Sequence, residues 1–279
     1  MLVAATVHTP TVRPFLKWAG GKGRLLEQYQ PHFPAQIGTY FEPFIGGGAV
    51  FFALRHRCQS AVLADINPEL VNVYHMVQTQ VEPLIARLRQ HRQRHDRDHY
   101  YTVRAQNDLQ CPVERAARLL YLNKTCYNGL YRENSKGYFN VPMGRYKNPC
   151  ICDPDLLRAA SAALGRSRVH QAAFDQILQQ SVCPQDFVYF DPPYHPISVT
   201  SSFTSYNRYG FTTQDQEQLQ QVFIALAKRG VRVMLSNSDC PFIRELYEGF
   251  PMHTIYSARA INSKAKRRGR ITELLITSY

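Results

Sequence analysis

The sequence predicts an α/β fold, and three observations support that prediction. An apolar, aromatic run at 186–190 is typical of a buried strand, and the prolines of Asp191-Pro192-Pro193-Tyr194 must end it because they lack an N–H for a sheet. Aromatic residues at 39–41 lead into three glycines and an apolar helical stretch. A helical pattern at 213–229 followed by a strand pattern at 231–235 continues the alternation.

Composition bounds the class of protein and its partner. The 279 residues are 44% hydrophobic and 19% charged, which is typical of a globular chain with a sizeable core. Lys and Arg number 33 against 21 Asp and Glu, so the net charge is +12. A surplus of this size indicates a polyanionic partner, with nucleic acid favoured over a membrane surface.

The cysteines and the N-terminus argue against a metal protein or a secreted one. The seven cysteines are scattered, and only Cys150 and Cys152 lie close, without the second pair that a zinc site requires. The first twelve residues lack the basic segment and the long apolar segment of a signal peptide, and no apolar run reaches membrane-spanning length. We therefore expect a soluble, cytoplasmic protein with reduced thiols, no metal and no membrane partner.

The first candidate ligand loop lies at residues 14–26. Gly20 and Gly21 stand in a basic segment and offer backbone N–H groups and cations to an anion. The segment is not a P-loop, because no Ser or Thr follows Lys22. A ligand-facing loop and an ordinary glycine turn both remain open.

The second candidate loop is the glycine turn at 46–48, after the strand pattern at 39–41. Its spacing differs from G-x-G-x-x-G, which disfavours a nicotinamide cofactor. A second strand pattern at 60–64 ends in Asp65, at the distance from the glycines where such folds place an acid on ribose hydroxyls. Asp65 could instead cap the helix that begins near Pro68.

The middle of the chain reads as helices followed by a hairpin. Helical patterns cover 69–90 and 112–122, and the charge-dense stretch 91–99 is typical of a solvated helix face. Asn128-Gly129 predicts the tip of a β-hairpin, with a return segment at 137–147 that mixes basic and aromatic residues. Such side chains can read base edges or wedge between bases, although a plain exposed hairpin has the same pattern.

Further elements complete the α/β pattern. Asp153-Pro154 opens a short helix, residues 168–175 read as a strand that ends beside Phe174, and a last strand covers 272–278. Residues 264–270 carry five basic side chains, a cluster that suits phosphate contact but also a solvated loop.

Four segments that occur together and in order carry a family resemblance. The chain resembles the Dam-type DNA adenine-N6 methyltransferases over its length from Phe15 to Tyr279. The four segments are Leu16-Lys17-Trp18-Ala19-Gly20-Gly21-Lys22, Phe41-Glu42-Pro43-Phe44-Ile45-Gly46-Gly47-Gly48, Tyr127-Asn128-Gly129-Leu130 with Phe139-Asn140-Val141-Pro142, and Asp191-Pro192-Pro193-Tyr194.

The resemblance implies a Rossmann-like S-adenosylmethionine-dependent methyltransferase sheet with an inserted, mainly helical DNA-recognition domain that carries a β-hairpin. It places the core at residues 1–68 and 153–279 and the target-recognition insert at 69–152. It implies that Phe44 and the glycines line the methionine side of the cofactor and that Phe174 packs on its adenine. The residues implied to bind the cofactor are Trp18, Lys22, Phe44, Gly46, Gly47, Gly48, Asp65, Phe174 and Asp191.

The resemblance also implies a site-specific, adenine-specific DNA methyltransferase that acts on double-stranded DNA, with GATC as the expected site. The expected enzyme is a nucleoid-associated monomer, and the sequence does not distinguish restriction-modification from replication or repair. The residues implied to contact DNA are Lys17, Tyr127, Asn128, Leu130, Arg132, Asn140 and Pro142, and the catalytic ones are Asp191, Pro192, Pro193 and Tyr194.

A mechanism follows from the chemistry of adenine. A base inside a duplex must be flipped out to reach a cofactor. The hypothesis is that Asp191 and the carbonyl of Pro192 accept the two N6 hydrogens while Tyr194 stacks on the flipped ring. Two alternatives remain at this point: an RNA or protein methyltransferase of the same fold, and a non-catalytic DNA-binding protein.

Overall fold

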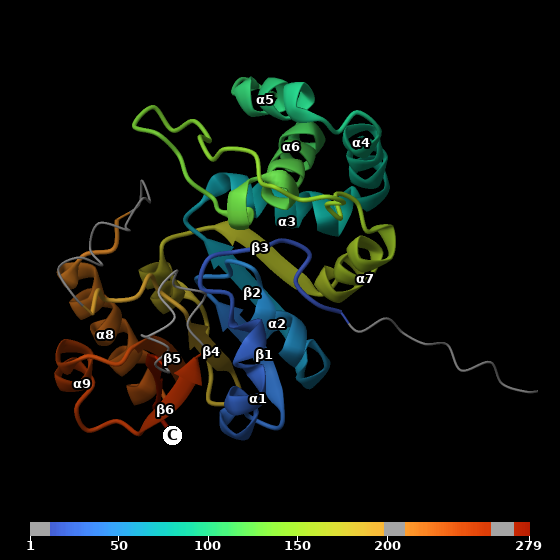
Figure 1. The fold of residues 1–279 in the computed structure, drawn as a ribbon. Helices are drawn as coiled ribbons and strands as arrows, with labels where there is room; N and C mark the ends of the chain where they lie inside the picture. The colour runs from blue at the N-terminus through green and yellow to red at the C-terminus, as the bar shows by residue number, and fades with distance from the viewer. Residues whose placement is uncertain (1–11, 198–209, 258–270) are drawn as a thin grey trace, which may run out of the picture.

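The computed structural model describes residues 12–197, 210–257 and 271–279, and within them the chain forms one seven-stranded mixed sheet (Figure 1). The strands are β1 (Ile37–Glu42), β2 (Cys58–Asp65), β3 (Ser167–Gln171), β4 (Phe187–Phe190), β5 (Arg232–Ser238), β6 (Met252–Ser257) and β7 (Ile271–Thr277). The order across the sheet is β3-β2-β1-β4-β5-β7-β6. Neighbours from β3 to β5 pair in parallel, and β7 pairs antiparallel with both β5 and β6.

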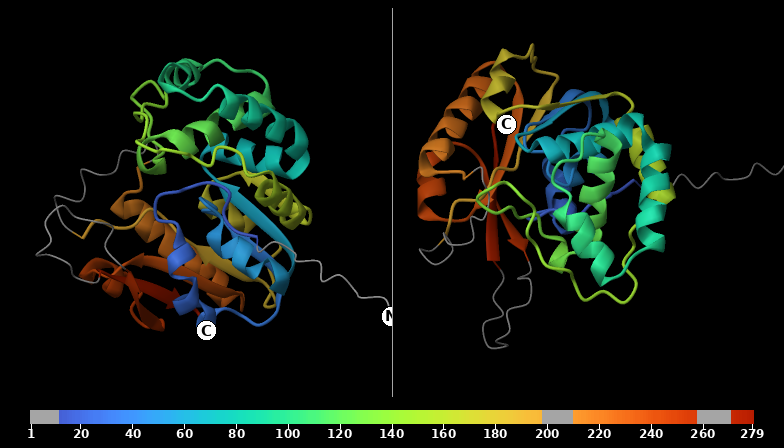
Figure 2. Two further views of the ribbon diagram at one scale, coloured as in Figure 1. Left: turned by 45° about the vertical axis from the view of Figure 1, so that its right-hand side comes forward. Right: turned by 90° about the horizontal axis from the view of Figure 1, so that it is seen from above.

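Helices cover both faces of the sheet. They are α1 (Leu26–Tyr29), α2 (Ala49–Leu54), α3 (Pro68–Thr79), α4 (Val81–Gln93), α5 (Arg97–Ala105), α6 (Pro112–Thr125), α7 (Pro154–Leu164), α8 (Thr213–Lys228) and α9 (Pro241–Leu246). Figure 2 shows α8 and α9 gathered on one side, away from the helices of the middle of the chain. The predicted α/β fold is therefore confirmed.

The alternation of side chains along the strands divides the core in two. Phe187 and Tyr189 of β4 pack with the helices of the first half of the chain, whereas Val188 and Phe190 pack under α8 and α9. Both groups are fully buried, which explains why β4 reads as one continuous apolar run and not as an alternating pattern.

The middle of the chain forms a helical region above β2 and β3 in Figure 1. The helical pattern at 69–90 corresponds to two helices, α3 and α4, because the backbone at Gln80 leaves the helical conformation. The charge-dense stretch 91–99 spans the end of α4 and the start of α5. There, His91 stacks on Tyr121 of α6, so this face is only partly solvated.

The prediction of a hairpin tip at Asn128-Gly129 is wrong. Both residues have positive φ, 56° and 66°, and the amide of Leu130 donates to the carbonyl of Tyr127, so a tight turn does form. However, α6 runs to Thr125 directly before it and leaves no strand to pair. The reversal lies at Asn134–Gly137 instead, next to the bridge between Glu133 and Phe139.

The predicted strand at 168–175 is too long. β3 ends at Gln171, which pairs with Asp65, the last residue of the neighbouring strand β2. The chain then leaves the sheet, and Phe174 begins a 3-10 helix that extends to Gln179. α9 and β6 complete the fold at positions where no element was predicted.

Among the described residues, no helix is long and apolar enough to cross a membrane. The same residues contain no cluster of three or more His, Cys, Asp or Glu side chains able to hold a metal ion.

Asp186 fixes the start of strand β4. Its carboxylate is buried and accepts hydrogen bonds from the amide of Thr39 at 2.7 Å and from the amide of Cys183 at 2.9 Å. It therefore ties the loop before β4 to β1, the neighbouring strand.

We expect Asp186→Ala to lower the free energy of unfolding by roughly 1–3 kcal/mol, because buried amides lose their acceptor. Urea denaturation followed by circular dichroism measures the loss. Asp186→Asn, which keeps one acceptor oxygen, should lose less, and Glu217→Ala on the exposed face of α8 is the control. Equal stability of Asp186→Ala and wild type would contradict the assignment.

Candidate active site

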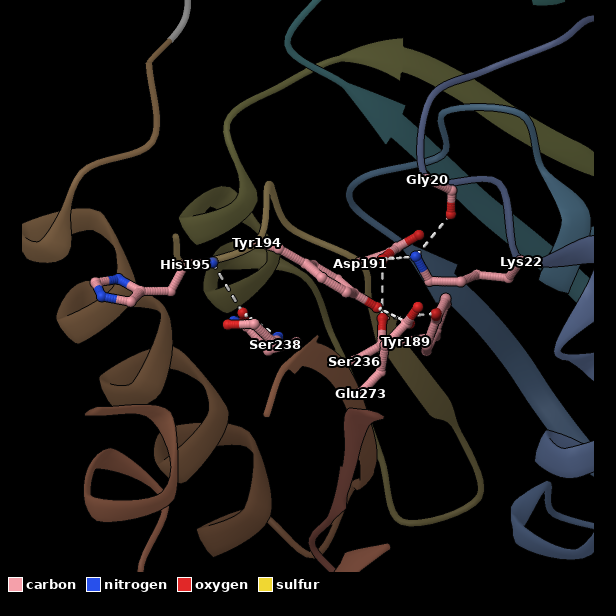
Figure 3. A network of polar contacts seen from close by, with 10 residues as sticks. Gly20, Lys22, Tyr189, Asp191, Tyr194, His195, Ser236, Ser238 and Glu273 are labelled. Carbon is pink, nitrogen blue, oxygen red and sulfur yellow. Dashed lines mark hydrogen bonds and ion pairs between the residues drawn. The ribbon is translucent and has the colours of Figure 1, made fainter. Parts of the chain in front are cut away.

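The Asp191-Pro192-Pro193-Tyr194 turn lies at the carboxyl edge of the parallel strands. It follows β4, whose neighbour is β1, and the chain proceeds from β1 to β2 on one side and from β4 to β5 on the other. This is the switch point of an open α/β sheet, where ligands bind. Figure 3 shows polar side chains from three other parts of the chain converging on the turn.

Asp191 is held by two donors on one oxygen. The ammonium of Lys22 lies 2.8 Å from Oδ1, and the hydroxyl of Ser236 donates to the same atom at 2.8 Å (Figure 3). The Lys22 side chain is 5% exposed and that of Asp191 20%. Burial raises the pKa of Asp191, and the Lys22 ammonium and the Ser236 hydroxyl oppose that rise. The charge of Asp191 therefore depends on the ammonium of Lys22.

Lys22 reaches this position from a short 3-10 helix after the Gly20-Gly21 turn. Its ammonium also donates to the carbonyl of Gly20 at 2.7 Å, and Gly20 has a positive φ of 77°. A left-handed residue at this point favours glycine, since a side chain there would be strained. The basic loop predicted to face a ligand thus places its lysine against the Asp191-Pro192-Pro193-Tyr194 turn.

Tyr194 is restrained at its hydroxyl and over its ring. The hydroxyl donates to Oε2 of Glu273 at 2.7 Å, and the Lys22 ammonium lies 4.5 Å from the ring centroid. Burial raises the pKa of Tyr194, with Asp191 acting in the same direction. The hydroxyl is therefore a protonated donor at neutral pH.

The backbone of the turn is fixed by two buried amides. The side chain of Gln216 on α8 donates to the carbonyl of Pro193 at 2.9 Å, and Asn237 on β5 accepts from the amide of His195 at 3.1 Å. The amide of Asn237 also donates to Gln216 at 2.9 Å. Because these groups satisfy one another inside the protein, the turn has a defined conformation.

Asp65 ties the glycine turn to the end of β2. Its carboxylate accepts from the amide of Gly46 at 3.2 Å and from that of Asn67 at 3.0 Å. Burial raises the pKa of Asp65 to about 6, against the effect of these N–H donors. Asn67 itself caps α3, accepting from the amides of Glu69 and Leu70, so the capping role considered for Asp65 belongs to Asn67.

The glycine turn approaches Trp18 closely. Gly46 and Gly48 have positive φ of 47° and 69°, and a Cβ on Gly46 would lie 2.9 Å from Cδ1 of Trp18. A Cβ on Gly47 would lie 3.3 Å from Cβ of Trp18. A larger residue at Gly46 would therefore push the indole ring away from the turn.

Phe44 and Phe174 form an aromatic wall beside the glycine turn. Their rings stack with centroids 5.6 Å apart, and Phe211 packs against both. The sequence prediction assigned these two rings to different ends of the cofactor, and the structure places them in direct contact.

Six of the seven predicted DNA-contact residues lie on the segment after α6, and the seventh is Lys17. Tyr127, Asn128, Leu130 and Pro142 are all exposed, and the amide of Tyr127 donates to the carbonyl of Pro142. Arg132 donates through Nε to the side-chain oxygen of Asn140 at 2.6 Å. The tight turn, rather than a hairpin tip, is what presents Tyr127 and Asn128.

Lys17 joins the N-terminal loop to the segment after α6. Its amide donates to Asn123 at 2.8 Å, its carbonyl accepts from Asn123 at 2.7 Å, and Asn123 also donates to the carbonyl of Gly129. The exposed Lys17 ammonium lies 4.5 Å from the ring centroid of Tyr146 and donates to its hydroxyl. Lys17 is therefore held in place beside Tyr127 and Asn128.

Sequence reasoning missed several residues that shape the site. Ser236 and Asn237 follow an apolar stretch, and polar residues at a strand end are a signal that could have found them. Gln216, Asn123 and Glu273 carry no such signal, because only tertiary contacts bring them to the site. The basic cluster at 264–270 lies outside the described residues.

The chain is similar to a known protein family and to individual proteins over most of its length. A family model described as D12 class N6 adenine-specific DNA methyltransferase matches residues 18–261. The chain is 44% identical over 275 residues to the type II methyltransferase M1.LlaDCHI of Lactococcus lactis subsp. cremoris, covering 96% of each chain. It is 43% identical to the type II methyltransferase M.MjaIII of Methanocaldococcus jannaschii, covering 96% of this chain and 99% of that protein. It is 36% identical to the DNA adenine methylase of Escherichia coli K12, covering 94% of each.

Proposed function

The chain belongs to the D12 class of N6 adenine-specific DNA methyltransferases, and on that premise we propose that it methylates the adenine of GATC sites in duplex DNA. Membership makes it an S-adenosylmethionine-dependent enzyme that methylates N6 of adenine in DNA. This decides against the alternatives of an RNA or protein methyltransferase and of a non-catalytic DNA-binding protein.

The residues present fit the cofactor. Asp65 uses one N–H contact on each oxygen, and an ionised carboxylate offers about four acceptor sites, which leaves capacity for ribose hydroxyls. The rings of Phe44 and Phe174 suit the adenine ring, and Trp18 packs on the glycine turn beside them. Trp18, Lys22, Phe44, the three glycines, Asp65, Phe174 and Asp191 are the residues to which we assign the cofactor.

The chemistry assigns roles to the catalytic turn. When bound, S-adenosylmethionine supplies a methyl group on a sulfonium, which departs as a neutral thioether. Both donors to Asp191 use Oδ1, so we assign Oδ2 to one N6 hydrogen of the adenine and the carbonyl of Pro192 to the other. These acceptors draw N6 toward tetrahedral geometry and free its lone pair for the methyl group.

Tyr194 and the fixed turn supply positioning. The Tyr194 ring stacks on the flipped adenine, a contact worth about 1–3 kcal/mol by analogy with single-strand binding proteins. Gln216 and Asn237 hold the turn before the base arrives, so little ordering remains to be done during the reaction. The N6 proton leaves after the methyl transfer, and Asp191 need not remove it beforehand.

The recognition loop supports the assignment of the DNA site. Lys17, Tyr127, Asn128, Leu130, Arg132, Asn140 and Pro142 resemble the GATC-reading segments of Dam-type enzymes. Tyr127 is 54% exposed and Leu130 39%, and apolar side chains at that exposure can enter the space left by a flipped base. Arg132 is the candidate for a bidentate guanine contact.

The remaining assignments complete the proposal. The target-recognition insert occupies residues 69–152 between core segments 1–68 and 153–279, and the enzyme acts as a cytoplasmic, nucleoid-associated monomer. Two relatives carry the names of type II methyltransferases, which supports a role in restriction-modification. Others are named DNA adenine methylases, which supports the alternative of a replication or repair role.

The observation that carries the proposal is the Asp191-Pro192-Pro193-Tyr194 turn held beside Lys22 at the switch point of the sheet. The test is transfer of labelled methyl groups from S-adenosylmethionine to a duplex with one GATC site. The control duplex carries N6-methyladenine at both GATC adenines and should take up no label. Sequencing of methylated genomic DNA then gives the site, and methylation outside GATC would overturn the assignment.

We expect Asp191→Ala to abolish methylation and to leave duplex binding within about threefold of wild type, because Asp191 accepts a hydrogen of the reacting amino group. Label transfer and a gel-shift titration measure the two quantities. Glu217→Ala on the exposed face of α8 is the control and should retain both. Turnover at the wild-type rate in Asp191→Ala would refute the mechanism.

Arg132→Ala should weaken the discrimination between the correct and the wrong base at one base pair of the site. The expected loss of discrimination is about 1–3 kcal/mol. Methylation rates on duplexes with single substitutions in GATC measure the discrimination. A uniform loss across all duplexes, with a smaller salt dependence, would instead mark Arg132 as a phosphate-binding residue.

Cofactor affinity should fall as the pH is lowered through about 6. The pKa of Asp65 is raised to about 6, so its carboxylate becomes neutral there and loses acceptor capacity for ribose hydroxyls. Quenching of Trp18, the one tryptophan of the chain, should report binding. The Asp65→Asn variant should bind the cofactor weakly, with an affinity that does not change from pH 5 to 7. A pH dependence of affinity in that variant equal to that of wild type would exclude Asp65 as the titrating group.

A further inference from the structure

Glu273 is the one acidic side chain that reaches the catalytic turn from the antiparallel end of the described sheet. It lies on β7, where its backbone pairs with Ser238 of β5 and Ile255 of β6. Because β7 runs opposite to β5, a residue near its start lies at the carboxyl edge of the parallel strands. Glu273 therefore meets Tyr194 although 79 residues separate them.

We propose that Glu273 is a positioning residue that fixes the Tyr194 ring for stacking on the target adenine. This rests on the proposed function, in which Tyr194 stacks on the flipped base. The observation is the hydrogen bond from the Tyr194 hydroxyl to Oε2 of Glu273 at 2.7 Å, drawn in Figure 3.

The backbone pairing of Glu273 determines where its side chain starts, and so favours one position of the hydrogen bond to Tyr194. Pairing on both sides fixes the backbone of Glu273, whereas Tyr194 follows two prolines in an irregular segment. The hydroxyl lies at the far end of the ring from the backbone, so the bond restrains the torsion that the turn alone leaves free. A hydrogen bond to an ionised acceptor is stronger than one between neutral groups, which suits this task.

The Lys22 ammonium adds a second restraint, from over the ring. It lies 4.5 Å from the Tyr194 centroid and 2.8 Å from Asp191. The ring is therefore held at its hydroxyl by β7 and on one face by the loop that neutralises Asp191. A base that stacks on Tyr194 meets a surface whose orientation is already set, which lowers the cost of ordering it.

Glu273 could act on the reaction in a second way, through its charge. Its carboxylate is one of the groups that raise the pKa of Asp191. Substitution by glutamine separates the two effects, because the amide oxygen still accepts from the Tyr194 hydroxyl while the negative charge is gone. The positioning role predicts that glutamine rescues activity, and a role of the charge predicts that it does not.

The experiment compares Glu273→Gln, Glu273→Ala, Tyr194→Phe and the double variant Tyr194→Phe/Glu273→Ala in single-turnover methylation of a one-site duplex. Glu273→Ala should slow methyl transfer about tenfold or more, with the KM for S-adenosylmethionine unchanged. Glu273→Gln should stay within about threefold of wild type. Tyr194→Phe loses the same bond from the other side and should show the loss even if Glu273→Ala does not fold.

Two results identify a positioning role. The double variant should be no slower than Tyr194→Phe, since both substitutions remove one interaction. With 2-aminopurine at the target position, fluorescence in complex with Glu273→Ala should exceed that with wild type, because stacking on Tyr194 is weaker.

Additive losses in the double variant, or a loss in Glu273→Gln equal to that in Glu273→Ala, would overturn the inference. Failure of the wild-type enzyme to methylate the duplex would instead refute the proposed function, so the two failures are distinguishable.

Discussion

The ion pair between Lys22 and Asp191 is the interaction on which the rest of the site depends. Asp191 lies among other carboxylates, since Glu42, Asp65 and Glu273 all approach the carboxyl edge of the sheet. Glu42 is fully buried, and burial raises its pKa well above the ordinary range even though Tyr40 donates to it at 2.9 Å. Breaking a buried pair from one side costs about 3–5 kcal/mol. The Lys22 ammonium favours the charged form of Asp191, whereas burial and the Glu273 carboxylate raise the pKa of Asp191.

The mixed sheet brings side chains from parallel and antiparallel strands to one edge. Parallel strands β1, β2, β4 and β5 end at one edge and deliver the glycine turn, Asp65, the catalytic turn and Ser236. A wholly parallel sheet could bring only strand ends and following loops to that edge. The reversed strand β7 places Glu273, near its beginning, against the same turn. The two amides Gln216 and Asn237 then lock the turn from α8 and β5.

Residues whose role is set by the local chain were predictable from the sequence, and residues brought in by tertiary contacts were not. The run into Asp191-Pro192-Pro193-Tyr194, the glycine turn and the strand before Asp65 carry local signals of strand, turn and ligand edge. The sequence predicted a tight turn at Asn128-Gly129, and the positive φ of both residues agrees with it. The turn does not join two strands of a hairpin, because helix α6 stands where the first strand was expected. Glu273 sits in an ordinary strand pattern, and nothing in that pattern reveals a partner 79 residues away.

The N-terminal loop carries both the contact of Lys17 with Asn123 and the contact of Lys22 with Asp191. The side chain of Asn123 hydrogen-bonds to the amide and the carbonyl of Lys17 and to the carbonyl of Gly129. These bonds connect the N-terminal loop to the Asn128-Gly129 turn. Lys22, five residues beyond Lys17, forms an ion pair with Asp191. Trp18, which lies between the two lysines in the sequence, packs against Tyr131 of the segment after α6. The segment after α6, which we propose to contact DNA, is therefore connected to the segment that carries Lys22, the counterion of Asp191. The backbone between Lys17 and Lys22 is anchored at one end by Asn123 and at the other by Asp191. The positions of the two lysines therefore depend on each other.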